Sequence, residues 1–172
     1  MYFSPRLIDF IAWGCDMGRV FEYHDRVRPE WIDYNGHMQD AYYGLVFSYA
    51  VDHVQDAVGF DQAYRDRTGA TIYVVEDHRK FLKEVHEGAD LVVQTRVLDV
   101  DAQRFHIHQT MLQAGRPVCI AEALEVHVTQ HPKAHITPMP AFAYDALTSA
   151  VLSADESETL HRICGAIRIC DP

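Results

Sequence analysis

The sequence predicts an α+β domain in which an antiparallel sheet wraps around one long helix. Residues 38–58 carry the 3.6-residue repeat of a helix whose apolar side chains cover much of its circumference. One extended segment precedes this helix and four follow it, so a sheet is available to cover it. The other face of that sheet would stay open, and a second copy of the chain is the usual cover for such a surface. We therefore expect an oligomer.

Turn signals mark the elements in order. A first strand is expected at residues 19–27, where Pro29 ends it, and residues 31–37 have the composition of a turn. Gly59 should end the long helix, as a C-terminal glycine does. The remaining elements, one short helix and four strands, are expected at residues 61–68, 70–85, 90–98, 104–113 and 118–129. Beyond them, three prolines are expected to end regular structure: Pro132, Pro138 and Pro140.

The long helix should have one polar stripe and a wide apolar side. Polar or small residues recur every four positions, at Asp40, Gly44, Ser48, Asp52 and Asp56. The residues expected to fill the other side are Met38, Ala41, Tyr42, Leu45, Tyr49, His53 and Ala57.

Length and charge restrict the class of protein. The chain has 172 residues, 48% of them hydrophobic, which suffices for one packed domain. We expect that domain at residues 19–130, between an N-terminal extension (1–18) and a C-terminal extension (131–172) that packs on it. The formal charge of −10 argues against nucleic acid as a partner, and no apolar run is long enough for a membrane span. Four scattered cysteines without a C-x-x-C pair suit reduced thiols in the cytoplasm.

The densest group of reactive side chains lies just before the long helix, at residues 31–38. A helix start presents free backbone N–H groups and a partial positive charge, which can polarise a carbonyl or hold an anion. Asp33 lies immediately upstream, and a carboxylate beside such an oxyanion site is the minimal equipment for acyl transfer. An ordinary capping turn, built from the same Asp, Asn and Gly, is the competing interpretation.

This segment resembles the entry to the central helix of hotdog-fold acyl-CoA thioesterases, and more narrowly the betainyl-CoA thioesterases of carnitine breakdown. The resemblance is carried by Pro29-Glu30-Trp31-Ile32-Asp33-Tyr34-Asn35-Gly36-His37-Met38, by Ala41-Tyr42-Tyr43, and by shorter matches through Val128. It implies a hotdog fold, an active site at a dimer interface, and hydrolysis of a small acyl-CoA. It assigns Asp33 as nucleophile or general base. The amides near Gly36 to Met38, together with Asn35 and His37, would complete the catalytic site.

Substrate recognition follows from the same resemblance. A trimethylammonium group is bound by aromatic faces and nearby carboxylates. The residues assigned to the substrate are Trp31, Tyr34, Tyr43, Glu76, His78 and Glu122, with Tyr42 as a further aromatic face. Tyrosines that pack the core and glutamates that face water are the alternative interpretation. The chain departs from the subgroup at Gln39-Asp40, at His108-Gln109 and at Glu125, where an apolar residue is expected.

The phosphates of CoA require a local basic patch on this acidic protein. The residues assigned to CoA are Arg79, Lys80, Lys83 and Arg104, although such charges commonly form a solvated face. The histidines His106-x-His108 and His127, His131 and His135 lack a zinc ligand pattern, so neither a metal nor a cofactor is expected.

We thus expect a cytoplasmic homodimer or homotetramer that acts on betainyl-CoA. One alternative is a hotdog thioesterase for another short-chain or aromatic acyl-CoA. The other is a non-catalytic module that binds acyl-CoA.

Overall fold

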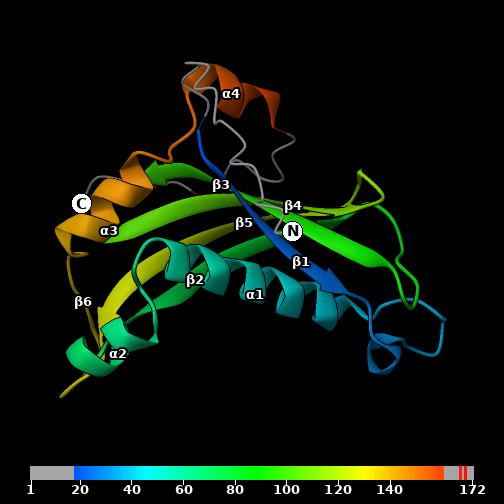
Figure 1. Ribbon diagram of the computed structural model, residues 1–172, viewed down its shortest axis with the longest axis horizontal. Helices are drawn as coiled ribbons and strands as arrows, with labels where there is room; N and C mark the ends of the chain where they lie inside the picture. The colour runs from blue at the N-terminus through cyan, green and yellow to red at the C-terminus, as the bar shows by residue number, and fades with distance from the viewer. Residues whose placement is uncertain (1–17, 161–166, 168, 170–172) are drawn as a thin grey trace, which may run out of the picture.

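A six-stranded antiparallel sheet curls around α1 (Asp40–Ala57) in the computed structural model, which describes residues 18–160, 167 and 169. The strand order is β1 (Val20–Arg26), β3 (Asp90–Val100), β4 (Arg104–Gln113), β5 (Arg116–Thr129) and β2 (Ala70–Phe81), and β6 (His135–Ile136) pairs with β5. Figure 1 shows α1 lying along the inner face of this sheet. The predicted α+β architecture is confirmed.

The helix α1 begins two residues later than predicted. Met38 forms an antiparallel bridge with Ile32, and its N–H donates to the Val85 carbonyl at 2.8 Å. Because Met38 is thereby held in extended backbone, the helix starts at Asp40. Its C-terminal end agrees with the prediction, since Gly59 follows with a φ of +95°.

The buried face of α1 is not the one that was predicted. The side chains that pack on the sheet are Tyr43, Val46, Phe47, Ala50, Val51, Val54 and Gln55. Ala41, His53 and Ala57, which were expected on the apolar side, are exposed. The prediction was wrong at these three positions because apolar residues occupy most of the helix, and the i, i+3, i+4 row with valine and phenylalanine has the larger apolar area to bury. Tyr42 and Leu45 of the predicted set do pack, partly buried, against the core. The predicted polar stripe, from Gly44 to Asp56, does lie outside the set of buried α1 residues.

The strand β2 is an edge of the sheet that the described residues form, and it contains a bulge. Its pairing with β5 shifts register between Val74 and Glu76, so that one extra residue, Val75, is inserted. The strand ends at Phe81, four residues before the predicted end. Exposed apolar side chains accompany this edge: Tyr73, Val74, Val75, Phe81 and Leu82.

The short helix and the C-terminal segment complete the domain. The helix α2 (Gln62–Thr68) lies where predicted, between the capping side chain of Asp61 and Gly69. The expectation that regular structure ends after Pro132 is wrong, because β6, α3 (Ala141–Thr148) and α4 (Ala154–Thr159) follow. Ser153 and Glu156 form a capping box that starts α4. A short 3-10 helix, Pro29–Trp31, precedes the turn before α1.

The expected packing of the C-terminal extension on the domain involves α3, which contributes two fully buried side chains, Ala143 and Leu147, to the core. The predicted N-terminal extension lies outside the described residues except for Gly18. Among the helices that are described, none is long and apolar enough to cross a membrane.

We predict that Leu147→Ala lowers the free energy of unfolding by about 2–5 kcal/mol, because Leu147 is fully buried between α3 and the sheet. The exposed neighbour Asp145 provides the control, and Asp145→Ala should change stability by about 0.5 kcal/mol or less. Urea unfolding of both variants would measure this. Equal effects would contradict the placement of α3 in the core.

Candidate active site

The segment before α1 folds into a tight turn that presents Asp33. The Asp33 N–H donates to the His37 carbonyl at 2.9 Å, and the Gly36 N–H donates to the Asp33 carbonyl at 3.0 Å. Gly36 has a φ of +80°, a conformation that glycine adopts without the steric cost borne by other residues. The Asp-Tyr-Asn-Gly sequence is therefore needed for the turn itself, as the capping interpretation supposed. This role does not exclude chemistry at the same carboxylate.

The Asp33 carboxylate is held ionised by Asn35. The Asn35 backbone N–H donates to Asp33 Oδ1 at 2.8 Å, and the Asn35 side-chain amide donates to Oδ2 at 3.3 Å. These bonds favour the charged form, and the backbone bond contributes most to lowering the pKa of Asp33 below its ordinary value. A carboxylate with this pKa is available as a nucleophile or base at neutral pH.

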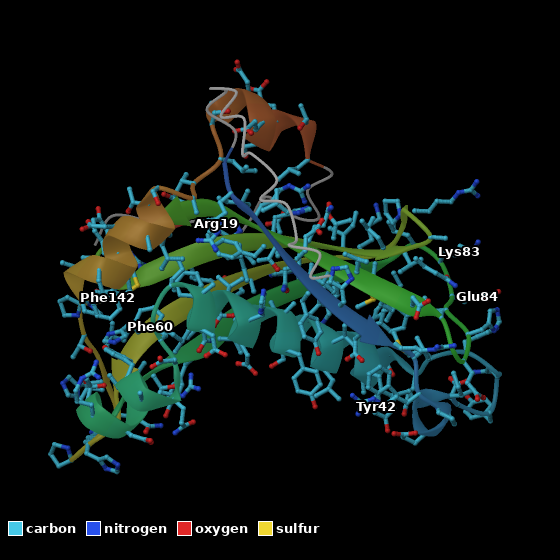
Figure 2. All side chains as sticks on the ribbon, viewed as in Figure 1. Arg19, Tyr42, Phe60, Lys83, Glu84 and Phe142 are labelled. Atoms are coloured by element: carbon cyan, nitrogen blue, oxygen red, sulfur yellow. The ribbon has the colours of Figure 1, made fainter. Side chains whose placement is uncertain are left out.

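Asp33 lines an open cleft of about 340 Å³ at the start of α1, here called the Asp33 cleft. Its lining residues are Asp33, His37, Met38, Asp40, Tyr43, Phe81, Leu82, Lys83 and Glu84. Figure 2 shows Lys83 and Glu84 at the end of the molecule where α1 begins. The cleft thus joins the turn, the first helical turn and the end of β2.

Tyr43 forms the buried wall of the Asp33 cleft. Its ring meets Phe81 edge to face with centroids 5.1 Å apart, and its hydroxyl donates to the Lys83 carbonyl at 3.5 Å. Burial raises the pKa of Tyr43 to about 12. The hydroxyl therefore stays protonated and can act only as a hydrogen-bonding group near neutral pH.

Two of the backbone amides assigned to the oxyanion hole already donate hydrogen bonds within the protein. The N–H groups of Gly36 and Met38 donate to backbone carbonyls of Asp33 and Val85. The first N–H groups of a helix have no acceptor within it, and the N-terminal cap residue Gln39 supplies no side-chain acceptor. Since α1 begins at Asp40, the amides of Asp40 and Ala41 are among those without an acceptor inside the helix, and Asp40 lines the cleft with Asp33.

Of the residues assigned to substrate, Tyr43 alone lines the Asp33 cleft. Trp31 is buried and stacks on Tyr42 with centroids 5.4 Å apart, whereas Tyr34 is 97% exposed. Glu76 and His78 bond to each other at 2.9 Å on β2. Glu122 is fully buried, with its Oε2 3.4 Å from His106 Nε2. Within one chain, these residues do not form a single pocket.

The residues assigned to CoA are also spread out. Lys83 lines the Asp33 cleft, and Lys80 is exposed on β2. Arg79 forms an ion pair with Asp77 at 2.9 Å. Arg104 is 2.8 Å from Asp101 in the turn between β3 and β4. Lys83 is thus the cation that the structure places beside Asp33.

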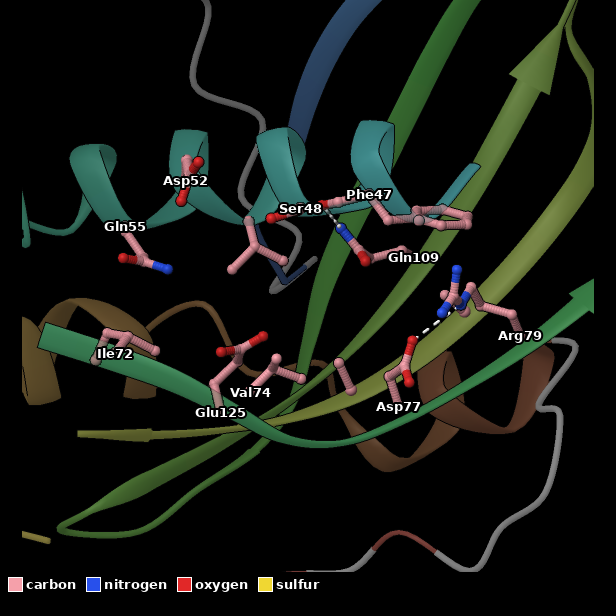
Figure 3. Close-up of a pocket in the computed structure, with 14 residues that line it drawn as sticks. Phe47, Ser48, Asp52, Gln55, Ile72, Val74, Asp77, Arg79, Gln109 and Glu125 are labelled. Atoms are coloured by element: carbon pink, nitrogen blue, oxygen red, sulfur yellow. Dashed lines mark hydrogen bonds and ion pairs between the residues drawn. The ribbon is translucent and has the colours of Figure 1, made fainter. Parts of the chain in front are cut away.

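A second cavity, of about 200 Å³, lies between α1 and the sheet and is here called the α1–sheet cavity. Figure 3 shows its residues: Phe47, Ser48, Asp52 and Gln55 from α1 face Ile72, Val74, Asp77, Arg79, Gln109 and Glu125 from the strands. Sequence reasoning registered Glu125 only as a departure from the subgroup. Its position opposite the polar stripe of α1 depends on strand pairing, which the sequence did not specify.

One cluster of metal-binding side-chain types occurs among the described residues. Potential ligand atoms of His37, Glu84 and His86 lie within 4.8 Å of one another, and two of these three residues are exposed. Sequence reasoning missed this cluster because His37 lies far along the chain from Glu84 and His86. The histidine series that it weighed instead is used structurally at His127, whose ring bonds to the Tyr64 hydroxyl at 2.8 Å.

The sequence matches a known family and several relatives. The model of the thioesterase-like superfamily matches residues 27–147. The betainyl-CoA thioesterase of Pseudomonas aeruginosa is 42% identical over 109 residues, which cover 62% of this chain and 69% of that relative. The L-carnitine dehydrogenase/betainyl-CoA thioesterase of Agrobacterium fabrum is 36% identical over 124 residues, covering 72% of this chain and 25% of that longer relative.

Solved structures share the fold. A Staphylococcus aureus protein in complex with CoA has a TM-score of 0.73 and 22% identity, and covers 93% of this chain and 100% of its own. The 1,4-dihydroxy-2-naphthoyl-CoA thioesterase of Synechocystis has a TM-score of 0.66 and 18% identity, covering 77% of this chain and 96% of its own. With the central helix, the curled antiparallel sheet and the family match together, the chain belongs to the thioesterase-like superfamily and has its hotdog fold.

Proposed function

We propose that the protein is an acyl-CoA thioesterase that hydrolyses betainyl-CoA to betaine and CoA. One observation carries the catalytic part of the proposal: the ionised Asp33 carboxylate lines a cleft beside the first amides of α1. The relatives from Pseudomonas aeruginosa and Agrobacterium fabrum support the choice of acyl group, because both are described as betainyl-CoA thioesterases.

The reaction needs a nucleophile, an oxyanion site and a leaving group. Asp33 either attacks the thioester carbonyl carbon or takes a proton from water, which then attacks. The developing oxyanion accepts hydrogen bonds from the first helical amides, and the Asp40 N–H is the best-placed donor because Asp40 lines the same cleft. The C–S bond breaks, and CoA leaves as a thiolate that needs no strong general acid. When water attacks directly, its oxygen enters the carboxylate product. When Asp33 attacks, a mixed anhydride between the acyl group and Asp33 forms, and water hydrolyses it to release the product and the free carboxylate.

We further propose that two chains associate through β2. Among the described residues no strand pairs with its outer edge, and such edges pair readily with another chain. Its exposed side chains are apolar, with Val74 58% and Val75 57% exposed. Phe81 and Leu82, which are also exposed, form one wall of the Asp33 cleft. A partner on this edge would therefore approach the cleft and could complete it.

Replacing the Asp33 carboxylate tests the catalytic proposal. We expect Asp33→Asn to lower kcat at least about 100-fold, because an amide neither attacks the thioester nor accepts a proton from water. CoA binding and the circular dichroism spectrum should stay unchanged. Asp56→Asn, at an exposed position near the other end of α1, should retain activity. Wild-type rates of thiol release by Asp33→Asn would refute the proposal.

A panel of substrates tests the acyl group. We expect kcat/KM for betainyl-CoA to exceed the values for acetyl-, butyryl- and benzoyl-CoA in a thiol-release assay. A preference for a neutral acyl group would support the alternative of a different short-chain or aromatic substrate. Tight binding of acyl-CoA with no thiol release from any of them would support the non-catalytic module.

Introducing a charge on the free edge tests the association. Val75→Asp should convert the oligomer to a monomer with reduced activity, because the carboxylate would be buried against a second copy. Val20, at the opposite edge on β1 and 39% exposed, gives the matched control Val20→Asp. Light scattering after size-exclusion chromatography measures both. An unchanged mass for Val75→Asp would place the interface elsewhere.

A further inference from the structure

The α1–sheet cavity is large enough for a small organic group. Its volume of about 200 Å³ exceeds the roughly 150 Å³ of an engineered protein cavity that admits benzene. Apolar side chains, among them Phe47, Val51 and Ile72, supply part of its wall. Figure 3 shows the Glu125 carboxylate pointing from the strand into this space, toward α1.

Glu125 is a buried carboxylate without a partner. The residue is 3% exposed, and within the described part of the chain it makes no hydrogen bond or ion pair. An ionised group in this state is costly, because it loses water and gains no compensating contact. Strongly perturbed titratable groups of this kind cluster at functional sites.

The charged groups that face Glu125 increase the negative charge of the cavity. Asp52 lies on α1 and Asp77 on β2. Burial is the main cause that raises the pKa of Glu125 to about 7, and the negative charges of Asp52 and Asp77 raise it further. Arg79 is the one cation among the lining residues, and it pairs with Asp77 at 2.9 Å. Glu125 is thus left without a counter-charge in the lining, whereas Asp52 is attracted by Arg65, which lies outside the lining.

We propose that the α1–sheet cavity binds a small organic cation, an alkylammonium or quaternary ammonium group, with Glu125 as its principal counter-charge. A bare metal ion suits the site less well, because hard cations require several oxygen ligands within a few ångströms. The cavity instead combines acidic groups with apolar walls and the aromatic ring of Phe47, and this combination recognises quaternary ammonium groups.

The cavity is adjacent to the Asp33 cleft. Tyr43 of the cleft and Gly44 of the cavity are consecutive on α1, and Phe81 and Arg79 lie close together along β2. The Arg79 guanidinium packs directly on Gly44, where a Cβ atom would overlap it. In Figure 3, Arg79 lies at the end of the cavity toward the start of α1. The identity of the natural cation rests on the proposed function, in which it is the trimethylammonium head of the acyl group. Because the subgroup is expected to carry an apolar residue at this position, the Glu125 counter-charge is assigned to this chain and not to its relatives.

Binding of choline to the full chain tests the site without any thioester. Choline should bind the wild type at pH 8, and Glu125→Gln, which keeps the shape and removes the charge, should weaken binding at least tenfold in isothermal titration calorimetry. Glu158→Gln, at an exposed position on α4, is the matched control and should bind as the wild type does. The neutral isostere 3,3-dimethylbutan-1-ol should bind the wild type and Glu125→Gln with equal affinity. Equal choline affinity for the wild type and Glu125→Gln, or no binding by the wild type, would overturn the proposal.

Thermal unfolding gives a second readout that does not require activity. Because burial raises the pKa of Glu125 above its unfolded value, ionisation of Glu125 destabilises the folded chain as the pH rises from about 5 to about 8. Glu125→Gln should therefore have a higher Tm than the wild type at pH 8. This difference in Tm should be smaller at pH 5, and choline should reduce it at pH 8. A difference in Tm that choline leaves unchanged would count against a cation at this carboxylate.

Kinetics separate this inference from the proposed function. Glu125→Gln should raise KM for betainyl-CoA at least tenfold and leave KM for its neutral isostere, 3,3-dimethylbutanoyl-CoA, unchanged. If the wild type hydrolyses betainyl-CoA and Glu125→Gln does so with equal KM, the cation site is wrong and the function stands. If choline binds through Glu125 but no acyl-CoA is hydrolysed, the proposed function is wrong and the site stands.

Discussion

The packing of α1 on the inner face of the sheet is the constraint on which both cavities depend. Val46 and Val54 are completely buried there, so the helix is fixed in rotation as well as in position. That rotation turns Gly44, Ser48 and Asp52 toward β2 and β5, and it sets the first helical turn beside Asp33. A hydrophobic contact thus determines where the polar chemistry of this protein can take place.

The sequence was sufficient for the order of the elements from β1 to β5 and for the turn that carries Asp33. Gly59 and Gly69 follow the ends of α1 and α2, and the capping Asp61 starts α2. Local signals of this kind are visible in a single chain. The buried face of α1 was misassigned because nearly every position offered an apolar candidate. The helix α3 was missed because the prolines before it were taken as an end, although proline is also favoured at helix starts.

The site was only partly predictable for a related reason. Asp33 and Asn35 are two residues apart, so their bond follows from local sequence. The open amide at Asp40 depends on where the helix begins, and this is fixed by the bridge between Ile32 and Met38 and by a contact from Val85. The meeting of Glu125 with Asp52 is long-range, and only the pairing of β5 within the curled sheet brings them together.

The bulge at Val75 decides which chemistry faces α1. Side chains alternate along a strand, yet Ile72 and Val74 before the bulge and Asp77 and Arg79 after it all line the same cavity. The extra residue resets the alternation, and Glu76 and His78 consequently project from the opposite side. If the same residues paired with β5 without a bulge, uninterrupted alternation would bring Glu76 and His78 into the cavity in place of Asp77 and Arg79. Gain or loss of a bulge in β2 therefore provides a route by which this fold could acquire a different ligand.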